Sequence, residues 1–193
     1  MKNLFSVLTL VAAFTFAFNS SSAQETFGNA GVEIAIPLGD WAEDVYGFGA
    51  GGSGGIELGL SDNFAVTANA GIVFLAVDDA LSDIIASSFL VPVQVGGRYY
   101  LDEQRSGLFL EGKVGIHLFS TSTEDQEIPG LGTIEGESNS ETYLSAAPQV
   151  GFFVNDNLSV ALRYQLFFIS EDEEVGRESD TGSFIGLKAA YNF

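Results

Sequence analysis

The chain has 193 residues, of which 46% are hydrophobic and 17% are charged, and it contains no cysteine. The lack of cysteine excludes disulfide bonds, thiolate metal sites, a cysteine nucleophile and lipoprotein anchoring. Only 7 Lys and Arg residues oppose 26 Asp and Glu residues, so the chain lacks the basic surface that nucleic-acid binding requires.

The first 23 residues are typical of a secretion signal. Lys2 gives a positive start, residues 4–18 form an apolar run, and small residues end the segment at Ala23. A retained membrane helix is the less favoured interpretation, because the run is shorter than the roughly 20 apolar residues that span a bilayer. We therefore expect residues 1–23 to be a cleaved signal peptide, which directs the chain to the periplasm. Residues 24–193 are then the mature domain.

Beyond Gln24 the apolar residues recur at every second position, which indicates β-strands with two different faces. Eight such segments follow in chain order: 32–36, 48–60, 64–75, 89–101, 108–119, 144–154, 158–168 and 185–193. The short connections are 61–63, 102–107 and 155–157, and the long ones are 38–46, 76–87, 120–140 and 170–181. Short turns on one side and long loops on the other are typical of transmembrane barrels. The pattern predicts an all-β fold, an eight-stranded antiparallel up-and-down transmembrane β-barrel.

The same pattern also fits a soluble, lipocalin-like barrel, in which the apolar face would be the interior. The composition of the other face favours the membrane, because it is rich in Gly, Ala and Ser and poor in charge. A face exposed to water would carry many Lys and Glu residues, whereas the narrow lumen of an eight-stranded barrel is filled by side chains. Aromatic residues near both ends of the apolar faces fit interfacial girdles: Phe48, Phe74, Phe89, Phe168, Phe64, Tyr99, Phe152, Tyr191 and Phe193.

Most charged residues within the segments occupy the inward positions. The predicted lumen network consists of Glu33, Glu57, Arg98, Glu111, Lys113, His117, Arg163 and Lys188. Gln94, Gln149 and Gln165 are expected beside it. Buried charges are costly unless they are paired, so we expect an ion-pair network that acts as a structural plug. A gated or selective pore is the alternative.

Motifs for catalysis or cofactor binding are weak in this chain. Residues 47–52 match a G-x-G-x-x-G spacing, but no helical pattern follows, so we interpret these glycines as small lumen residues. His117 is the only histidine; with no second histidine or cysteine, we expect a hydrogen-bonded lumen residue rather than a metal ligand. No cofactor, metal or catalytic residue is predicted, and an enzyme is the third hypothesis.

Two long connections are strongly acidic. The acidic residues in or beside them are Glu124, Asp125, Glu127, Glu135, Glu137, Glu141, Glu171, Asp172, Glu173, Glu174, Glu178 and Asp180. A solvated, mutually repelling surface is the simpler interpretation. The alternative hypothesis is that divalent cations bridge these connections to anionic lipopolysaccharide, although no EF-hand spacing is present.

The chain ends in an amphipathic segment with aromatic residues at Tyr191 and Phe193, and residues 37–40 read Pro-Leu-Gly-Asp. In these features it resembles the small outer-membrane β-barrels of Gram-negative bacteria, of the OmpA/OmpX type, although Lys188 stands where a glycine is often found. The resemblance implies that Tyr191 and Phe193 are an assembly signal for the outer-membrane assembly machinery. Family members include tethering proteins, adhesins and small-molecule channels, so membership does not fix the function.

These observations predict a monomeric barrel in the cell outer membrane, in contact with lipid and lipopolysaccharide. We expect it to be non-catalytic, with a filled lumen and a structural or surface-interaction role through its acidic extracellular loops. The alternative is a narrow channel or transporter for small solutes.

Overall fold

The computed structural model describes residues 25–39, 42, 45–77, 85–102, 106–123, 126–128, 132–134, 137–169 and 180–193. The expected signal peptide lies outside these residues and stays a prediction. Within the described ranges, no helix is both long and apolar enough to span a bilayer.

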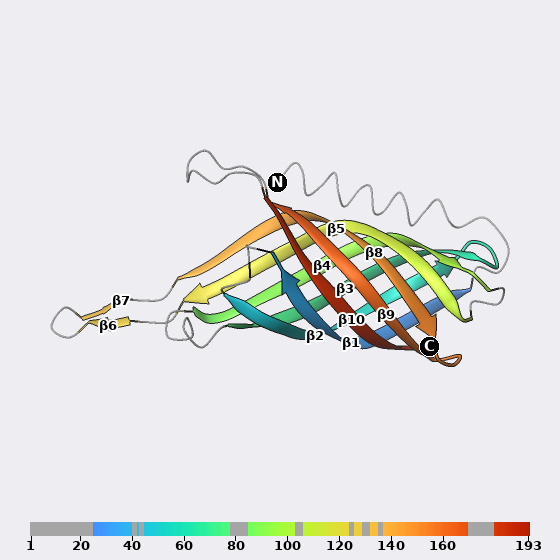
Figure 1. Ribbon diagram of the computed structural model, residues 1–193, viewed down its shortest axis with the longest axis horizontal. Helices are drawn as coiled ribbons and strands as arrows, with labels where there is room; N and C mark the ends of the chain where they lie inside the picture. The colour runs from blue at the N-terminus through green and yellow to red at the C-terminus, as the bar shows by residue number, and fades with distance from the viewer. Residues whose placement is uncertain are drawn as a thin grey trace.

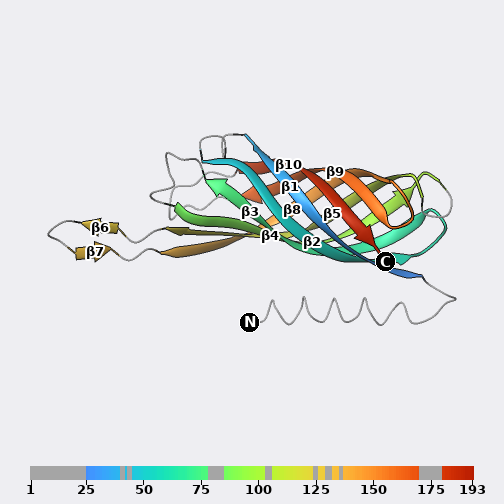
Figure 2. The same cartoon turned by 90° about the horizontal axis from the view of Figure 1, so that it is seen from below.

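Eight of the strands in the described residues close into one antiparallel barrel (Figures 1 and 2). They are β1 (Thr26–Leu38), β2 (Tyr46–Gly59), β3 (Phe64–Val77), β4 (Ile85–Tyr100), β5 (Leu108–Thr123), β8 (Ser138–Phe153), β9 (Leu158–Ile169) and β10 (Asp180–Asn192). The order around the barrel is β1-β10-β9-β8-β5-β4-β3-β2. The predicted fold class is therefore confirmed.

The barrel closes where the first strand pairs with the last. β1 and β10 are antiparallel, with a register that runs from Asn29 opposite Asn192 to Leu38 opposite Ser183. Because side chains alternate between the two faces of a strand, a slip of one residue would exchange the lipid-facing and interior sets. The hydropathy pattern therefore fixes this register.

Tight turns join the strands at the end of the barrel where the C-terminus lies (Figure 1). In the turn between β8 and β9, the Asn155 side-chain oxygen accepts hydrogen bonds from the backbone N–H groups of Asn157 and Leu158, at 3.0 and 2.9 Å. This is the local bonding that makes asparagine a preferred turn residue. In the turn before β5, Gly107 has a φ of 67°, a conformation that glycine adopts without a steric penalty.

The long connection predicted at 120–140 is shorter than expected. β5 continues to Thr123 and β8 begins at Ser138, and between them β6 (Gln126–Ile128) pairs with β7 (Gly132–Ile134). The extended parts of β5 and β8 consist mostly of Ser and Thr, so they lack the alternation of apolar residues that marks a strand in the sequence. Backbone pairing continues all the same, with Ser122 opposite Ser138.

The two faces of the barrel wall differ sharply in chemistry. Leu144, Val114 and Leu187 on the outside are 68%, 60% and 55% exposed, which places apolar side chains where lipid would surround them. Charged and aromatic side chains from the same strands point inward and are buried. The interior is therefore the solid core of the molecule.

Candidate functional site

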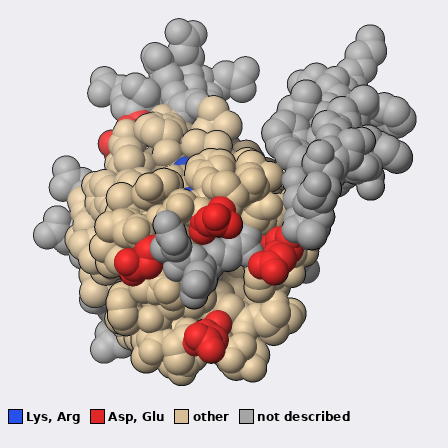
Figure 3. Space-filling model, turned by 90° about the vertical axis from the view of Figure 1, so that its right-hand side faces the viewer, with Lys and Arg blue, Asp and Glu red and all other residues tan. Residues whose placement is uncertain are grey.

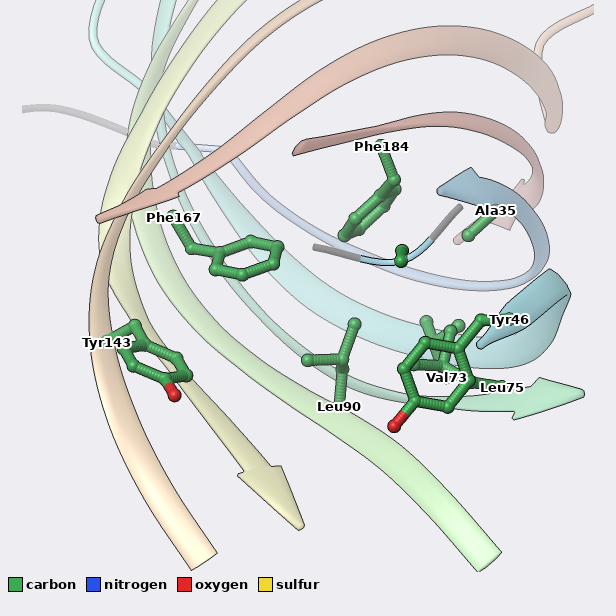
Figure 4. Packing of buried hydrophobic residues seen from close by; sticks show 9 residues of the cluster. Ala35, Tyr46, Val73, Leu75, Leu90, Tyr143, Phe167 and Phe184 are labelled. Atoms are coloured by element: carbon green, nitrogen blue, oxygen red, sulfur yellow. The ribbon is translucent and has the colours of Figure 1, made fainter. Parts of the chain in front are cut away.

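The interior is built in layers, and an apolar layer closes the end nearest the long connections. We call it the loop-side cluster; Figure 4 shows its packing. Its buried members are Ala35, Ala42, Tyr46, Val73, Leu75, Leu90, Tyr143, Phe167 and Phe184. At its edge the hydroxyl oxygens of Tyr46 and Ser88 lie 3.1 Å apart. Side chains from seven strands therefore occupy the bore at this end, and all but the Ala35 contribution of β1 are large.

A second apolar layer lies near the short turns, and we call it the turn-side cluster. It joins Tyr100, Phe109, Ala65 and Ala161, with Phe153 packed against them. The ring centroids of Tyr100 and Phe109 are 6.0 Å apart, and those of Phe109 and Phe153 are 5.7 Å apart. These separations are favourable for aromatic pairs. The glycine at position 151 makes room for this layer, because a Cβ there would lie 2.1 Å from the Phe109 ring.

Between the two clusters lies a layer of ion pairs. Arg98 donates to Glu57 through Nη1 at 2.7 Å and to Glu111 through Nη2 at 2.9 Å. The Tyr100 hydroxyl donates to the second oxygen of Glu57, also at 2.7 Å. The Arg98 guanidinium lies 4.3 Å from the centre of the Phe109 ring, so the ionic layer and the turn-side cluster are in direct contact.

Glu111 has the largest number of polar partners in this layer. Besides Arg98, it accepts hydrogen bonds from Thr67 Oγ1 at 2.7 Å and from Gln149 Nε2 at 2.9 Å. Lys113 Nζ lies 4.0 Å away. The Glu111 side chain has no exposed surface. A carboxylate buried to this degree is stable only with such complete pairing.

A separate ion pair joins the two sides of the barrel closure. Arg163 on β9 donates through Nη2 to Glu33 on β1. Gly186 on β10 lies between them, and a Cβ at that position would come within 2.5 Å of Glu33 Oε1. Glycine is therefore needed on β10 for the pair to form across it.

Neutral amides form a further part of the interior. Gln94 Nε2 donates to Ser145 Oγ at 3.2 Å and to Gln165 Oε1 at 3.3 Å. Gln165 in turn donates to the backbone carbonyl oxygens of Ala146 and Leu166. These bonds connect β4, β8 and β9 across the lumen, so they tie together strands that are not all neighbours in the wall.

His117 differs from the expectation of a hydrogen-bonded histidine. Its side chain is fully buried, and within the described part of the chain neither ring nitrogen has a hydrogen-bond partner. The ring packs instead against Phe167 and Phe184, with centroid distances of 6.1 and 6.3 Å. Phe167 and Phe184 thus place the imidazole among rings rather than among polar groups. In the described residues, no group of three or more His, Asp and Glu side chains is arranged to hold a metal ion.

All eight residues of the sequence-predicted network point into the lumen, but they do not form one continuous network. Glu57, Arg98, Glu111 and Lys113 form one cluster, whereas Glu33 and Arg163 form another. Lys188 is only partly buried and donates to Asn29 Oδ1 at 3.1 Å. His117 stands apart, as described above.

The inward aromatic residues are the part of the site that the sequence interpretation missed. Phe109, Phe167 and Phe184 lie at inward positions of strands whose other inward residues are mostly small or polar. The period of two already assigned them to the interior, so the signal was present in the sequence. The interpretation of the glycines at 47–52 as lumen residues is wrong for Gly52. Gly49 and Gly51 face the interior, whereas Gly52 has the opposite orientation.

The C-terminus is fixed to the first strand at the turn side. Gly28 and Phe193 exchange two backbone hydrogen bonds, at 2.7 and 2.9 Å, and the rings of Tyr191 and Phe193 stack with centroids 6.4 Å apart. Figure 3 shows this end of the barrel, with acidic groups around the rim and traces of Lys or Arg atoms deeper between other residues. The structure does not test an assembly signal at Tyr191 and Phe193, which stays a prediction.

An apolar outer belt, a closed antiparallel wall and a filled interior define a transmembrane β-barrel protein. The family model of the outer membrane protein beta-barrel domain matches residues 7–193. The chain belongs to this family. No curated protein sequence matches the chain significantly.

Solved structures show the same fold at low sequence identity. Ail, the attachment invasion locus protein of Yersinia pestis, is 16% identical with a TM-score of 0.57; the match covers 89% of this chain and 100% of Ail. The N-terminal β-barrel domain of Pseudomonas aeruginosa OprF is 13% identical with a TM-score of 0.55, again over 89% of this chain and 100% of the domain. At such identities the likeness concerns the fold alone.

Proposed function

We propose that the protein is a non-conducting, non-catalytic barrel that reinforces the outer membrane and presents its acidic connections as an interaction surface. The observation that carries this proposal is the layered interior, in which apolar clusters lie above and below the ion pairs. A hydrated ion on its way through would have to displace rings such as Phe167 and Phe109. Closely packed protein interiors do not yield such space without a large cost in free energy.

Conductance in planar lipid bilayers tests the closed bore. We expect no steady openings from the wild-type barrel. Truncating both apolar clusters, with Phe109→Ala, Phe167→Ala and Phe184→Ala combined, should produce openings because it removes rings from both ends of the bore. The matched control is Phe168→Ala, which removes an outward ring next to Phe167 and should leave the barrel silent.

The opposite result would favour the alternative function. Steady, ion-selective openings from the wild-type protein would contradict a structural plug and support a narrow channel for small solutes. A folded triple variant that stays silent would show that the apolar clusters are not what closes the bore. Folding is checked in each case by the gel mobility of unheated samples.

The surface role rests on charge. The acidic residues of the 170–179 connection lie outside the described residues. The support for their role is the composition of the chain, which has 26 Asp and Glu residues against 7 Lys and Arg residues. In this proposal divalent cations neutralise the acidic connections and link them to the phosphates of lipopolysaccharide. The acidic connections are then the extracellular side, and the short turns with the C-terminus are the periplasmic side.

Calorimetry with calcium tests the surface role on the folded barrel in detergent. We expect heat of binding that the combined substitutions Glu171→Gln, Asp172→Asn, Glu173→Gln and Glu174→Gln reduce. The control removes acidic groups from the short-turn end instead, with Asp62→Asn, Asp102→Asn and Asp156→Asn combined. No heat from wild type, or equal loss in both variants, would contradict the proposal.

A further inference from the structure

A pocket opens into the lumen beside the turn-side cluster, and its lining is basic. It encloses about 280 Å³ of space not occupied by atoms, part of it open solvent. Its lining includes the polar side chains of Asn69, Arg98, Lys113, Gln149, Lys188 and Asn29, and no carboxylate-bearing side chain lines the pocket. A cationic pocket is unexpected in a chain whose formal net charge is −19.

The charges of the interior do not balance in this region. The lumen network has four Lys and Arg residues but three Glu residues, and Lys188 is the cation of these four that forms no salt bridge within the described residues. Glu33 lies opposite Lys188 in the β1–β10 register but forms its salt bridge with Arg163, and the hydrogen bond of Lys188 goes to the neutral Asn29 side chain. A half-buried ammonium group with no carboxylate bonded to it is costly. An anion beside Lys188 would remove that cost.

Hydrogen-bond donors in the pocket also lack acceptors. An ammonium group has three N–H donors, and Lys113 Nζ has a close acceptor in Gln149 Oε1 at 2.8 Å, with Glu111 farther away at 4.0 Å. Asn69 Nδ2 is buried and has no partner within the described ranges. Gly55 makes room for this amide, since a Cβ there would lie 2.4 Å from Asn69 Oδ1. The three cations Arg98, Lys113 and Lys188 and the unpartnered Asn69 amide thus line one small space.

We propose that this pocket binds one small monovalent anion of the size of chloride, held by Lys188, Lys113 and Asn69. The enclosed part is small, on the scale of one water molecule or one monatomic ion, so we expect it to favour a halide over an organic anion. Arg98 already donates to two carboxylates, so it contributes charge rather than a free donor. We expect the ion to enter beside the turn-side cluster, where Ser159 and Asn192 also line the pocket, because the loop-side cluster lies between the pocket and the other end.

Chlorine NMR on the folded barrel in detergent tests the proposal, because a chloride ion that exchanges with a protein site has a broadened resonance. We expect wild-type protein to broaden the line and added bromide to reverse the effect by competition. Lys188→Gln should weaken chloride affinity by about tenfold, the scale of a lost hydrogen bond from a charged group. The matched control is Arg105→Gln, which removes the same charge from the connection between β4 and β5.

A second variant keeps the test decisive if Lys188→Gln does not fold. Asn69→Leu leaves the charge unchanged and removes only the unpartnered donor, so affinity should fall by about fivefold. Absence of protein-dependent broadening in wild type would mean that water occupies the pocket, and would overturn the proposal. So would equal broadening by Lys188→Gln, Asn69→Leu and Arg105→Gln.

Discussion

Glu111 offers a direct test of how the interior stabilises the barrel. Glu111→Gln keeps the shape of the side chain but removes its charge, which lies 2.9 Å from Arg98 Nη2 and 4.0 Å from Lys113 Nζ. Removing one partner of a buried ion pair costs about 3–5 kcal/mol. We expect about 3 kcal/mol here, because Glu57 still pairs with Arg98 at 2.7 Å. That is about a hundredfold change in the ratio of folded to unfolded protein.

Urea titration of the barrel in phospholipid vesicles, followed by the gel mobility of unheated samples, measures this loss. Adding Lys113→Met to Glu111→Gln should recover part of it, because the second change removes the ammonium group that has lost its carboxylate. The exposed turn carboxylate of Asp156 gives the control, and Asp156→Asn should leave the urea midpoint unchanged. A loss below about 1 kcal/mol for Glu111→Gln, the range of exposed pairs, would refute the account of a desolvated ionic layer.

Three further substitutions test other parts of the interior and the barrel closure. Gly186→Val should lower the stability in urea by about 1–3 kcal/mol, because its side chain would occupy the position of the Glu33 carboxylate; an unchanged midpoint would contradict this. Phe167→Ala should cost about 3–5 kcal/mol, whereas the neighbouring outward Phe168→Ala should cost clearly less. Phe193→Ala should slow assembly into membranes that contain the assembly machinery more than it slows spontaneous folding in detergent. Equal slowing in both would argue against an assembly signal.

The inward ionic residues could be assigned from the sequence, but their partners could not. Period two placed Glu33, Glu111 and Arg163 on the inward side. Which carboxylate meets which cation depends on strand stagger around the closed wall, and residues 33 and 163 meet although 130 positions separate them. No local pattern carries that information.

The apolar clusters show a second limit of the sequence pattern. The period of two places Phe109 and Phe184 on the inward face, but an apolar ring there interrupts the alternation of apolar and polar residues, so the pattern alone does not show that such rings pack together. In the structure these rings gather from separate strands into two layers. Only the structure shows why positions 151 and 186 are glycines: a Cβ at 151 would clash with the Phe109 ring, and a Cβ at 186 would clash with the Glu33 carboxylate.

By itself, the sequence determined the number of strands in the barrel, their antiparallel order and the side of each strand that faces lipid. These follow from local alternation and from the requirement that every backbone group be bonded within a membrane. The tertiary structure alone decided that rings fill the lumen toward both ends, that the ionic residues divide into separate clusters, and that Lys188 forms no salt bridge within the described residues. Those outcomes depend on which inward side chains reach the same height in the closed barrel, and that height is set by register and tilt.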